Sequence, residues 1–220
     1  MAKYAITGLA GSGKDTVGKM IADEFNTKTY ALAEPIYQLV SRLFDVTIER
    51  MQDRAFKEKT LLYKVDVTSL EDCGMYFNEV GLDTYQMFHD AWEEWIELFG
   101  LKEDGDVYST QISIRKALQL LGTEWGRSKV DTMWLDLAPA NAVITDVRFD
   151  NEAEYFIAKD YTILEVVRPG VKSITESSHA SENGISQYLV DTTIYNDDTL
   201  KTLNEKVLVY MLSDSPQSII

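Results

Sequence analysis

The glycine-rich stretch GLAGSGKDT, at residues 8–16, is the feature that most constrains how this chain can fold. It follows a short apolar run at 4–7 and opens a helical pattern that continues to Phe25. Its glycines let the backbone turn tightly and direct N–H groups inward, while the following helix adds the positive end of its dipole and Lys14 adds a mobile cation. The order of strand, loop, lysine and helix favours a phosphate-binding loop for a nucleoside triphosphate over a glycine turn that merely caps a helix. The predicted triphosphate-binding residues are Gly11, Ser12, Gly13, Lys14, Asp15 and Thr16.

The residue after the lysine departs from the usual pattern of such loops. Ser or Thr normally stands there and its hydroxyl meets magnesium, but this chain has Asp15 and places Thr16 one position later. Magnesium could then be held by Thr16, by Asp146 through water, or mainly by the phosphates of the nucleotide. A Gly-Lys-any-Thr ending resembles the nucleoside monophosphate kinases rather than the GTPases or motor ATPases.

Composition and charge limit the possible functions. A chain of 220 residues, 45% of them apolar, can bury one sizeable core, so we expect one domain with a substantial insertion. The single cysteine, Cys73, cannot form an internal disulfide, and no signal sequence or membrane-spanning run is visible, which predicts a cytoplasmic protein, in the host cytoplasm if viral. The formal net charge of −15 disfavours a nucleic acid polymer as partner but permits a small phosphorylated ligand.

Short strand-like runs alternate with helical patterns along the chain. This order predicts an α/β fold of three layers, with a five-stranded parallel sheet covered by helices. We place the strands at 4–7, 29–32, 142–145, 162–167 and 192–195. Helices are expected at 14–25, from Pro35 onward, at 151–159 and at 199–212.

The span 45–113 interrupts this alternation and is predicted to be a largely helical insertion. Within it, aromatic residues recur every three or four positions, which predicts one aromatic face on a helix. These residues are Tyr85, Phe88, Trp92, Trp95 and Phe99. Such a face is usually buried in a core, and a base-stacking role or a homodimer interface is the alternative.

Two further segments carry candidate site residues. In SIRKALQLLGTEWGR, at 113–127, Arg115 and Gln119 share one helix face that could hold a phosphate and a base edge, and Gly122 is expected to end the helix. The apolar strand that reaches Asp146 fits the second phosphate-site element of such folds, where a carboxylate orients magnesium, its waters or the attacking group. Arg148 is expected over the same cleft.

The order of these motifs resembles the bacteriophage deoxynucleoside monophosphate kinases. The segments that carry the likeness are 8–16, Ala33-Glu34-Pro35, RAFKE at 54–58, 113–127 with Trp134, ITDVRFDNEAEYF at 144–156, and HASE at 179–182. They cover most of the chain, but residues 60–108 carry none of the matching motifs.

The resemblance implies a P-loop kinase that transfers the γ-phosphoryl group of ATP to the 5′-phosphate of a deoxynucleoside monophosphate, with Mg²⁺ as cofactor. It implies that Lys14, Arg127, Asp146 and Arg148 act at the transfer point. The implied acceptor-binding residues are Glu34, Arg54, Lys57, Arg115, Gln119, Glu124 and Arg127. The span 45–113 would form the acceptor side of one kinase domain, and 168–186 would be a lid-like segment.

Several alternatives remain open. His179 is either a solvated surface residue or a catalyst, and Asn196-Asp197 fits either a loop near the adenine of the donor or an ordinary turn. A dephospho-coenzyme A kinase or a kinase of modified bases in DNA would share the loop and the strand that carries Asp146. The LGTEWGR segment argues against the first of these and the net charge against the second. From a different class, a P-loop protein could bind nucleotide to switch a partner, with the aromatic insertion as its docking surface.

Overall fold

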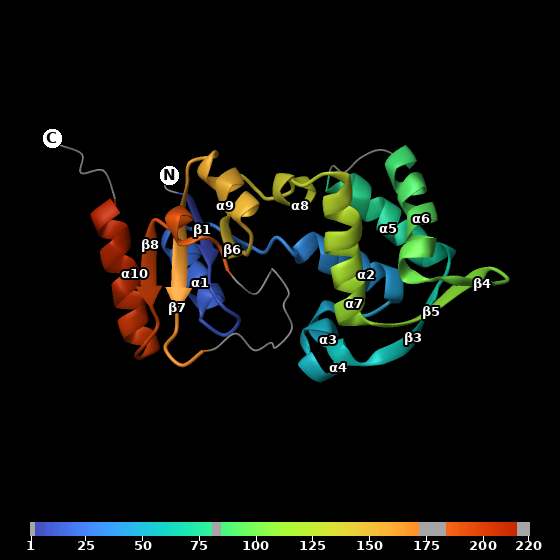
Figure 1. Cartoon of the computed structure of the whole chain (residues 1–220), viewed down its shortest axis with the longest axis horizontal. Helices are drawn as coiled ribbons and strands as arrows, with labels where there is room; N and C mark the ends of the chain where they lie inside the picture. Colours follow the sequence, from blue (N-terminus) through green and yellow to red (C-terminus); the bar gives the residue numbers. More distant parts are fainter. Residues whose placement is uncertain (1–2, 81–84, 172–183, 215–220) are drawn as a thin grey trace. The chain divides into compact units, whose positions relative to one another are not determined.

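The computed structural model describes residues 3–80, 85–171 and 184–214. The chain forms two compact units, residues 1–32 with 138–220, and residues 33–137. The first unit is assembled from both ends of the chain, whereas the second is one continuous segment (Figure 1). None of the helices in the described ranges is long and apolar enough to cross a membrane.

The first unit is built on a five-stranded sheet in the order β2-β6-β1-β7-β8, in which every neighbouring pair is parallel. Its strands are β1 (Lys3–Thr7), β2 (Thr29–Tyr30), β6 (Val143–Val147), β7 (Tyr161–Val167) and β8 (Thr192–Tyr195). The predicted parallel sheet is confirmed, and each strand end lies within two residues of its expected position. Thr7 is in register with Val147 on one side and Glu165 on the other, so the carboxyl ends of the three central strands share one edge.

Helices cover both faces of this sheet. They are α1 (Lys14–Glu24), α9 (Asp150–Ile157) and α10 (Leu200–Asp214), with a short 3₁₀ helix, η3 (Gln187–Leu189), before β8. Helices α1 and α10 pack on one face, where Val17 and Val207 share a cluster with Leu164 of β7. Because side chains alternate along a strand, Tyr161 turns to the other face, and Phe156 of α9 packs against its ring with centroids 5.1 Å apart. The three-layer architecture is therefore confirmed.

The second unit combines helices with a small antiparallel sheet (Figure 1). Its helices are α2 (Glu34–Phe44), α3 (Ile48–Gln52), α4 (Arg54–Glu58), α5 (Val67–Glu79), α6 (Tyr85–Phe99), α7 (Ile114–Gln119), the π-helix η1 (Leu120–Arg127) and α8 (Met133–Asp136). Its strands β3 (Thr60–Val65), β4 (Lys102–Asp104) and β5 (Val107–Ser113) pair in the order β3-β5-β4.

The small sheet was absent from the sequence prediction, which described 45–113 as largely helical. Strand β4 has the sequence KED and is exposed at every position, so no apolar alternation marks it as a strand. It forms because Gly105, at φ +67°, turns the chain back and lets β4 pair with β5 through the backbone. The pairing of β4 with β5 depends on the turn between them, and the hydrophobic pattern of the sequence does not predict it.

The aromatic residues of α6 belong to the core of the second unit. Trp95 is fully buried and Phe99 nearly so, and the Trp95 ring lies edge-on to Trp125 of η1 with centroids 5.3 Å apart. Phe77 of α5 contacts both tryptophans. The prediction that the aromatic face is core is confirmed at Trp95 and Phe99, while the side chains of Tyr85 and Phe88 lie outside the described residues.

The helix that begins at Ile114 does not end at Gly122, so that prediction is wrong. It continues as the π-helix η1 to Arg127. Gly122 packs close to α2, since a Cβ there would lie 2.7 Å from Ile36 Cδ1, the movable end of that side chain. Trp134 Nε1 donates a hydrogen bond to the Gly122 carbonyl oxygen at 2.9 Å, and a Cβ on Gly126 would meet the Trp134 ring at 2.3 Å. The two glycines of LGTEWGR therefore let α2 and Trp134 approach the helix.

Cys73 is a core residue of α5. Burial raises the pKa of its thiol to about 12, so the thiolate is not formed at neutral pH.

Candidate functional site

The loop between β1 and α1 depends on glycine at three positions. Gly8, Gly11 and Gly13 have φ angles of +142°, +82° and +99°, which side chains with a Cβ rarely adopt. A Cβ on Gly8 would also lie 2.4 Å from the Val166 carbonyl oxygen. The loop is closed by a hydrogen bond from Ser12 N to the Leu9 oxygen at 3.1 Å, and α1 begins when Val17 N bonds to the Gly13 oxygen at 3.0 Å.

Ser12 carries a polar atom that the loop leaves unsatisfied. The residue is 1% exposed, and its hydroxyl oxygen has no hydrogen-bond partner among the described residues. A buried hydroxyl without a partner is costly, so the Ser12 hydroxyl is a polar atom in the glycine-rich loop that a bound ligand or water could satisfy. Lys14 begins α1 and is partly buried, while Asp15 and Thr16 are exposed in the first turn of that helix.

Asp146 is placed beside this loop by the sheet. It lies one residue before the end of β6, the strand next to β1, and is 8% exposed. Its Oδ1 accepts a hydrogen bond from Leu32 N at 2.6 Å. One carboxylate oxygen therefore supports the chain that leaves β2, a contact that sequence reasoning missed.

Arg148 is exposed just beyond β6, and its backbone is held by a residue that the sequence analysis left out. The buried Glu152 uses Oε2 to accept hydrogen bonds from Arg148 N at 2.7 Å and Phe149 N at 3.2 Å. Glu152 forms only the reciprocal half of a capping box, in which it accepts from the backbone N–H of the N-cap residue Phe149. Phenylalanine has no side-chain oxygen for the other half, so no capping-box signature in the sequence marks Glu152. Glu152 fixes the turn that carries Arg148.

In the second unit, the structure brings several predicted acceptor-binding residues together around α4. Helix α7 packs against both α4 and α2. Lys57 Nζ donates to the Tyr37 hydroxyl and lies 4.7 Å from the centre of that ring, while Arg115 Nε pairs with Glu58 Oε1. Tyr37 was missed by sequence reasoning, although it follows Glu34 by one helical turn.

The other acceptor candidates lie on neighbouring elements of the same unit. Arg54 is exposed at the start of α4, and Glu34 is exposed at the start of α2. Gln119, the exposed Glu124 and the partly buried Arg127 follow Arg115 along the continuous helical segment formed by α7 and η1. Among the described residues, no side-chain contact assigns these five to base, sugar or phosphate.

The lid-like segment is described only at its ends. Residues 172–183, which include His179, lie outside the described residues. Beyond them, Asp150 accepts hydrogen bonds from Ser186 N at 2.7 Å and from Ser186 Oγ at 2.6 Å, and these bonds lower the pKa of the Asp150 carboxyl. The segment is therefore attached at its carboxyl end to the start of α9.

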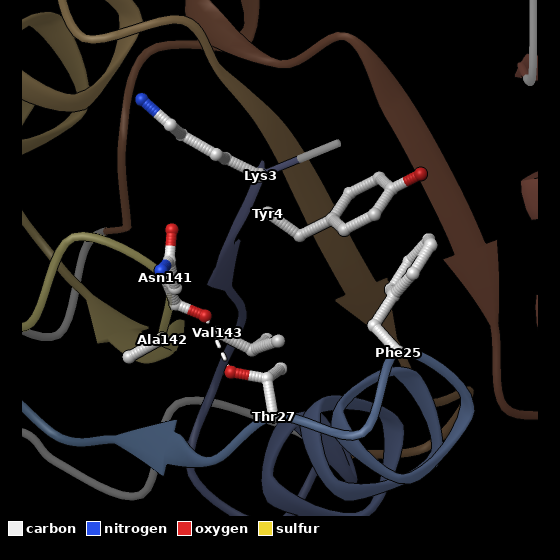
Figure 2. Close-up of a pocket in the computed structure, with 7 residues that line it drawn as sticks. All are labelled: Lys3, Tyr4, Phe25, Thr27, Asn141, Ala142 and Val143. Carbon is white, nitrogen blue, oxygen red and sulfur yellow. Dashed lines mark hydrogen bonds between the residues drawn. The ribbon is translucent and has the colours of Figure 1, made fainter. Parts of the chain in front are cut away.

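A small hollow at the opposite edge of the sheet is not part of this site. It lies at the amino ends of β1 and β6, whereas the loop follows the carboxyl end of β1 (Figure 2). Thr27 Oγ1 donates to the Asn141 oxygen across it at 2.5 Å. Its lining residues are Lys3, Tyr4, Phe25, Thr27, Asn141, Ala142 and Val143.

The parallel sheet, the glycine loop with its lysine, and the aspartate on the adjacent strand define the P-loop kinase-like class of α/β proteins. The sequence model of a family described as "Deoxynucleotide monophosphate kinase" matches residues 4–207. The chain belongs to this family, and it is a nucleoside monophosphate kinase.

Curated relatives from bacteriophages agree with this assignment. The chain is 35% identical to the deoxynucleoside-5′-monophosphate kinase of Escherichia phage T5, over 94% of each protein. It is 26% identical to the deoxynucleotide monophosphate kinase of Enterobacteria phage T4, over 92% of this chain and 95% of the relative. The corresponding protein of Escherichia phage RB69 is 25% identical over 92% of this chain. The likeness to a phage kinase family that the motifs suggested is therefore confirmed.

Proposed function

We propose that this chain transfers the γ-phosphoryl group of ATP to the 5′-phosphate of deoxynucleoside monophosphates and so supplies diphosphates for DNA synthesis. Membership of the family and the names of its phage relatives support this substrate class. The main structural support for ATP as the phosphoryl donor is the loop at 8–13. It contains the unsatisfied Ser12 hydroxyl and lies beside the strand of Asp146.

The donor phosphates are held by Gly11, Ser12, Gly13, Lys14, Asp15 and Thr16. Transfer of a phosphoryl group needs no covalent enzyme intermediate; it depends on in-line positioning and on neutralising the charge spread over the transferred group. Lys14, Arg127 and Arg148 supply the positive charge. Asp146, buried and anchored on Leu32 N, keeps a fixed carboxylate at the transfer point.

Phosphoryl transfer generally uses a metal ion, and the residues around the loop suit Mg²⁺. Thr16 and Asp146, the latter through water, offer the hard oxygen donors that this ion prefers. The described residues contain no group of three or more His, Cys, Asp or Glu side chains that could form a closed metal cage, which suits an ion held largely by phosphates and water. When bound, Mg²⁺ would neutralise charge on the donor phosphates.

The acceptor is held by Glu34, Arg54, Lys57, Arg115, Gln119, Glu124 and Arg127. The contacts of Lys57 with Tyr37 and of Arg115 with Glu58 support this assignment, because they hold two cations on adjoining helices. We place 45–113 on the acceptor side of a single kinase domain. The role of 168–186 as a lid stays a prediction.

ATP and a deoxynucleoside monophosphate are the proposed partners, in the cytoplasm, and in the host cytoplasm if the chain is viral. The net charge of −15 supports a mononucleotide over a nucleic acid polymer, since each phosphate of a strand would approach an acidic protein. A homodimer is compatible with this proposal but is not required by it.

The deciding experiment measures ADP release by a coupled assay. Release is expected only when a deoxynucleoside monophosphate is present, and radiolabelled ATP should transfer label to the monophosphate and not to single- or double-stranded oligonucleotides. Label in the oligonucleotides alone would favour the kinase of DNA bases, label on dephospho-coenzyme A would favour that kinase, and ADP release independent of any acceptor would favour a nucleotide switch.

Arg115 and Arg127 provide a test of the acceptor side. Replacing either with alanine should raise the Kd for the monophosphate about 10- to 100-fold, because a charged hydrogen bond contributes about 1.5–3 kcal/mol. The Kd for ATP should change little. Calorimetric titration of each ligand alone measures both.

Two variants serve as controls for Arg115. Lys116→Ala removes the same charge from the next, exposed position of α7, and Glu58→Gln removes the negative charge but keeps an oxygen that can accept from Arg115 Nε. Both should bind the monophosphate nearly as the wild type does. An equal loss of ATP binding in Arg115→Ala or Arg127→Ala would move that residue to the donor side.

A further inference from the structure

Asn196, directly after β8, is joined to the phosphate loop by its side chain. Its Nδ2 donates a hydrogen bond to the Ser12 carbonyl oxygen at 2.8 Å. The same nitrogen lies so close to Gly13 that a Cβ there would be 2.5 Å from it. Asn196 therefore contacts two successive loop residues at the point where the loop enters α1.

Asn196 is itself held in place by the sheet and by α10. Its backbone N donates to the Val167 oxygen of β7 at 2.8 Å. On either side of it, Lys206 Nζ donates to the Tyr195 oxygen at 2.9 Å and to Asp197 Oδ1 at 2.5 Å. A side chain supported in this way on regular elements can hold the loop to a defined geometry.

The hydrogen bond from Asn196 to the Ser12 carbonyl oxygen determines the direction in which the Gly13 N–H points. In a trans peptide unit the carbonyl oxygen and the next N–H point in opposite directions, so fixing the Ser12 oxygen also fixes the N–H of Gly13. Glycine crosses easily between positive and negative φ, so this peptide unit could turn over without an anchor.

We propose that Asn196 is a positioning residue for the donor nucleotide, which holds the Ser12–Gly13 peptide unit so that the Gly13 N–H faces the phosphates. This inference rests on the proposed triphosphate-binding role of residues 11–16. Asn196 would then act through the loop backbone, without contacting the base or sugar of the nucleotide.

Two substitutions of Asn196 distinguish the effect of its hydrogen bond to Ser12 from the effect of the space that its side chain fills. Asn196→Ala removes the donor, and the Kd for ATP should rise about tenfold, as expected when one hydrogen bond is lost. Asn196→Asp keeps the shape, but an ionised carboxylate only accepts hydrogen bonds, so it repels the Ser12 oxygen and adds negative charge beside the phosphates. Its Kd for ATP should rise further, by about 100-fold.

Calorimetric titration with ATP, and separately with the best monophosphate substrate, measures these effects in both variants. Asp197→Asn is the matched control, since it changes the charge of the same turn while its amide oxygen can still accept from Lys206 Nζ, and it should keep the wild-type Kd for ATP. The Kd for the monophosphate should stay unchanged in all three. Thermal unfolding checks each fold, and if Asn196→Asp does not fold, the comparison of Asn196→Ala with Asp197→Asn decides alone.

The turnover of Lys14→Ala, measured alongside, separates the role of Asn196 from the assignment of the loop. Wild-type ATP affinity in Asn196→Ala together with strongly reduced turnover in Lys14→Ala would overturn the role of Asn196 and leave the loop assignment standing. Equal losses for ATP and for the monophosphate in Asn196→Ala would reduce Asn196 to a general structural residue. Unchanged ATP affinity in Asn196→Ala together with near-normal turnover in folded Lys14→Ala would overturn the loop assignment itself.

Discussion

Replacing Lys14 with alanine should lower kcat by about 10³-fold or more and leave the fold intact. The ammonium group stabilises negative charge that builds up mainly in the transition state, so its loss affects turnover more than folding. Lys14 begins α1 and does not belong to the buried core of the first unit. Steady-state kinetics together with a thermal unfolding curve test both parts of this prediction.

Lys19→Ala provides the control for Lys14. Lys19 lies on the same helix, is exposed and pairs with Asp23 at 3.0 Å, so its replacement removes the same charge away from the loop. Surface ion pairs of this kind contribute little to stability, and the variant should keep both its turnover and its melting temperature. Near-normal turnover in folded Lys14→Ala would refute the assignment of the phosphate loop.

Asp146 should separate a catalytic role from a structural one when two substitutions are compared. Asp146→Asn keeps an oxygen that can accept the hydrogen bond from Leu32 N but removes the negative charge, so kcat should fall by about 10²-fold with little change in stability. Asp146→Ala removes the acceptor as well. It should also lower the free energy of unfolding by about 1–3 kcal/mol, because a buried amide loses its partner.

Denaturant unfolding and steady-state kinetics of both Asp146 variants give the comparison. The expected pattern is a shared loss of kcat with a loss of stability in the alanine variant alone. If Asp146→Asn turned over at the wild-type rate, the carboxylate would serve only to hold the chain after β2, and the transfer point would need another carboxylate.

The parallel sheet and its loop could be predicted because their signals are local in sequence. Each strand is a short apolar run, and the loop, its lysine and α1 occupy consecutive positions. The antiparallel sheet could not be predicted in the same way, because β4 has no apolar residue and forms only through its turn at Gly105. The π-helix was missed because Gly122 indicates a helix end, whereas in the structure Gly122 lies inside η1 and packs close to Ile36 of α2.

The residues of the candidate site also fall into those that local sequence motifs reveal and those that only the folded structure reveals. Lys14 and Asp146 stand in motifs that sequence alone reveals. Asn196 and Tyr37 gain their significance from partners distant in sequence, Ser12 and Lys57, and only the folded backbone brings these together. Glu152 was also missed, since a phenylalanine at the N-cap gives no capping-box signature, and only the folded backbone shows that its carboxylate holds the amides of Arg148 and Phe149.

The assembly of the first unit from both ends of the chain has a consequence for biosynthesis. The segment 33–137 has all of its own partners once residue 137 has left the ribosome, whereas Ala5 of β1 must wait for Ile144. At a translation rate of about 5–20 residues per second, the interval between the synthesis of Ala5 and that of Ile144 is on the order of ten seconds. Because Asn196 follows the last strand of the sheet, the Ser12 carbonyl gains its partner only when translation is nearly finished. The nascent chain therefore completes its second unit first and acquires a finished phosphate loop last.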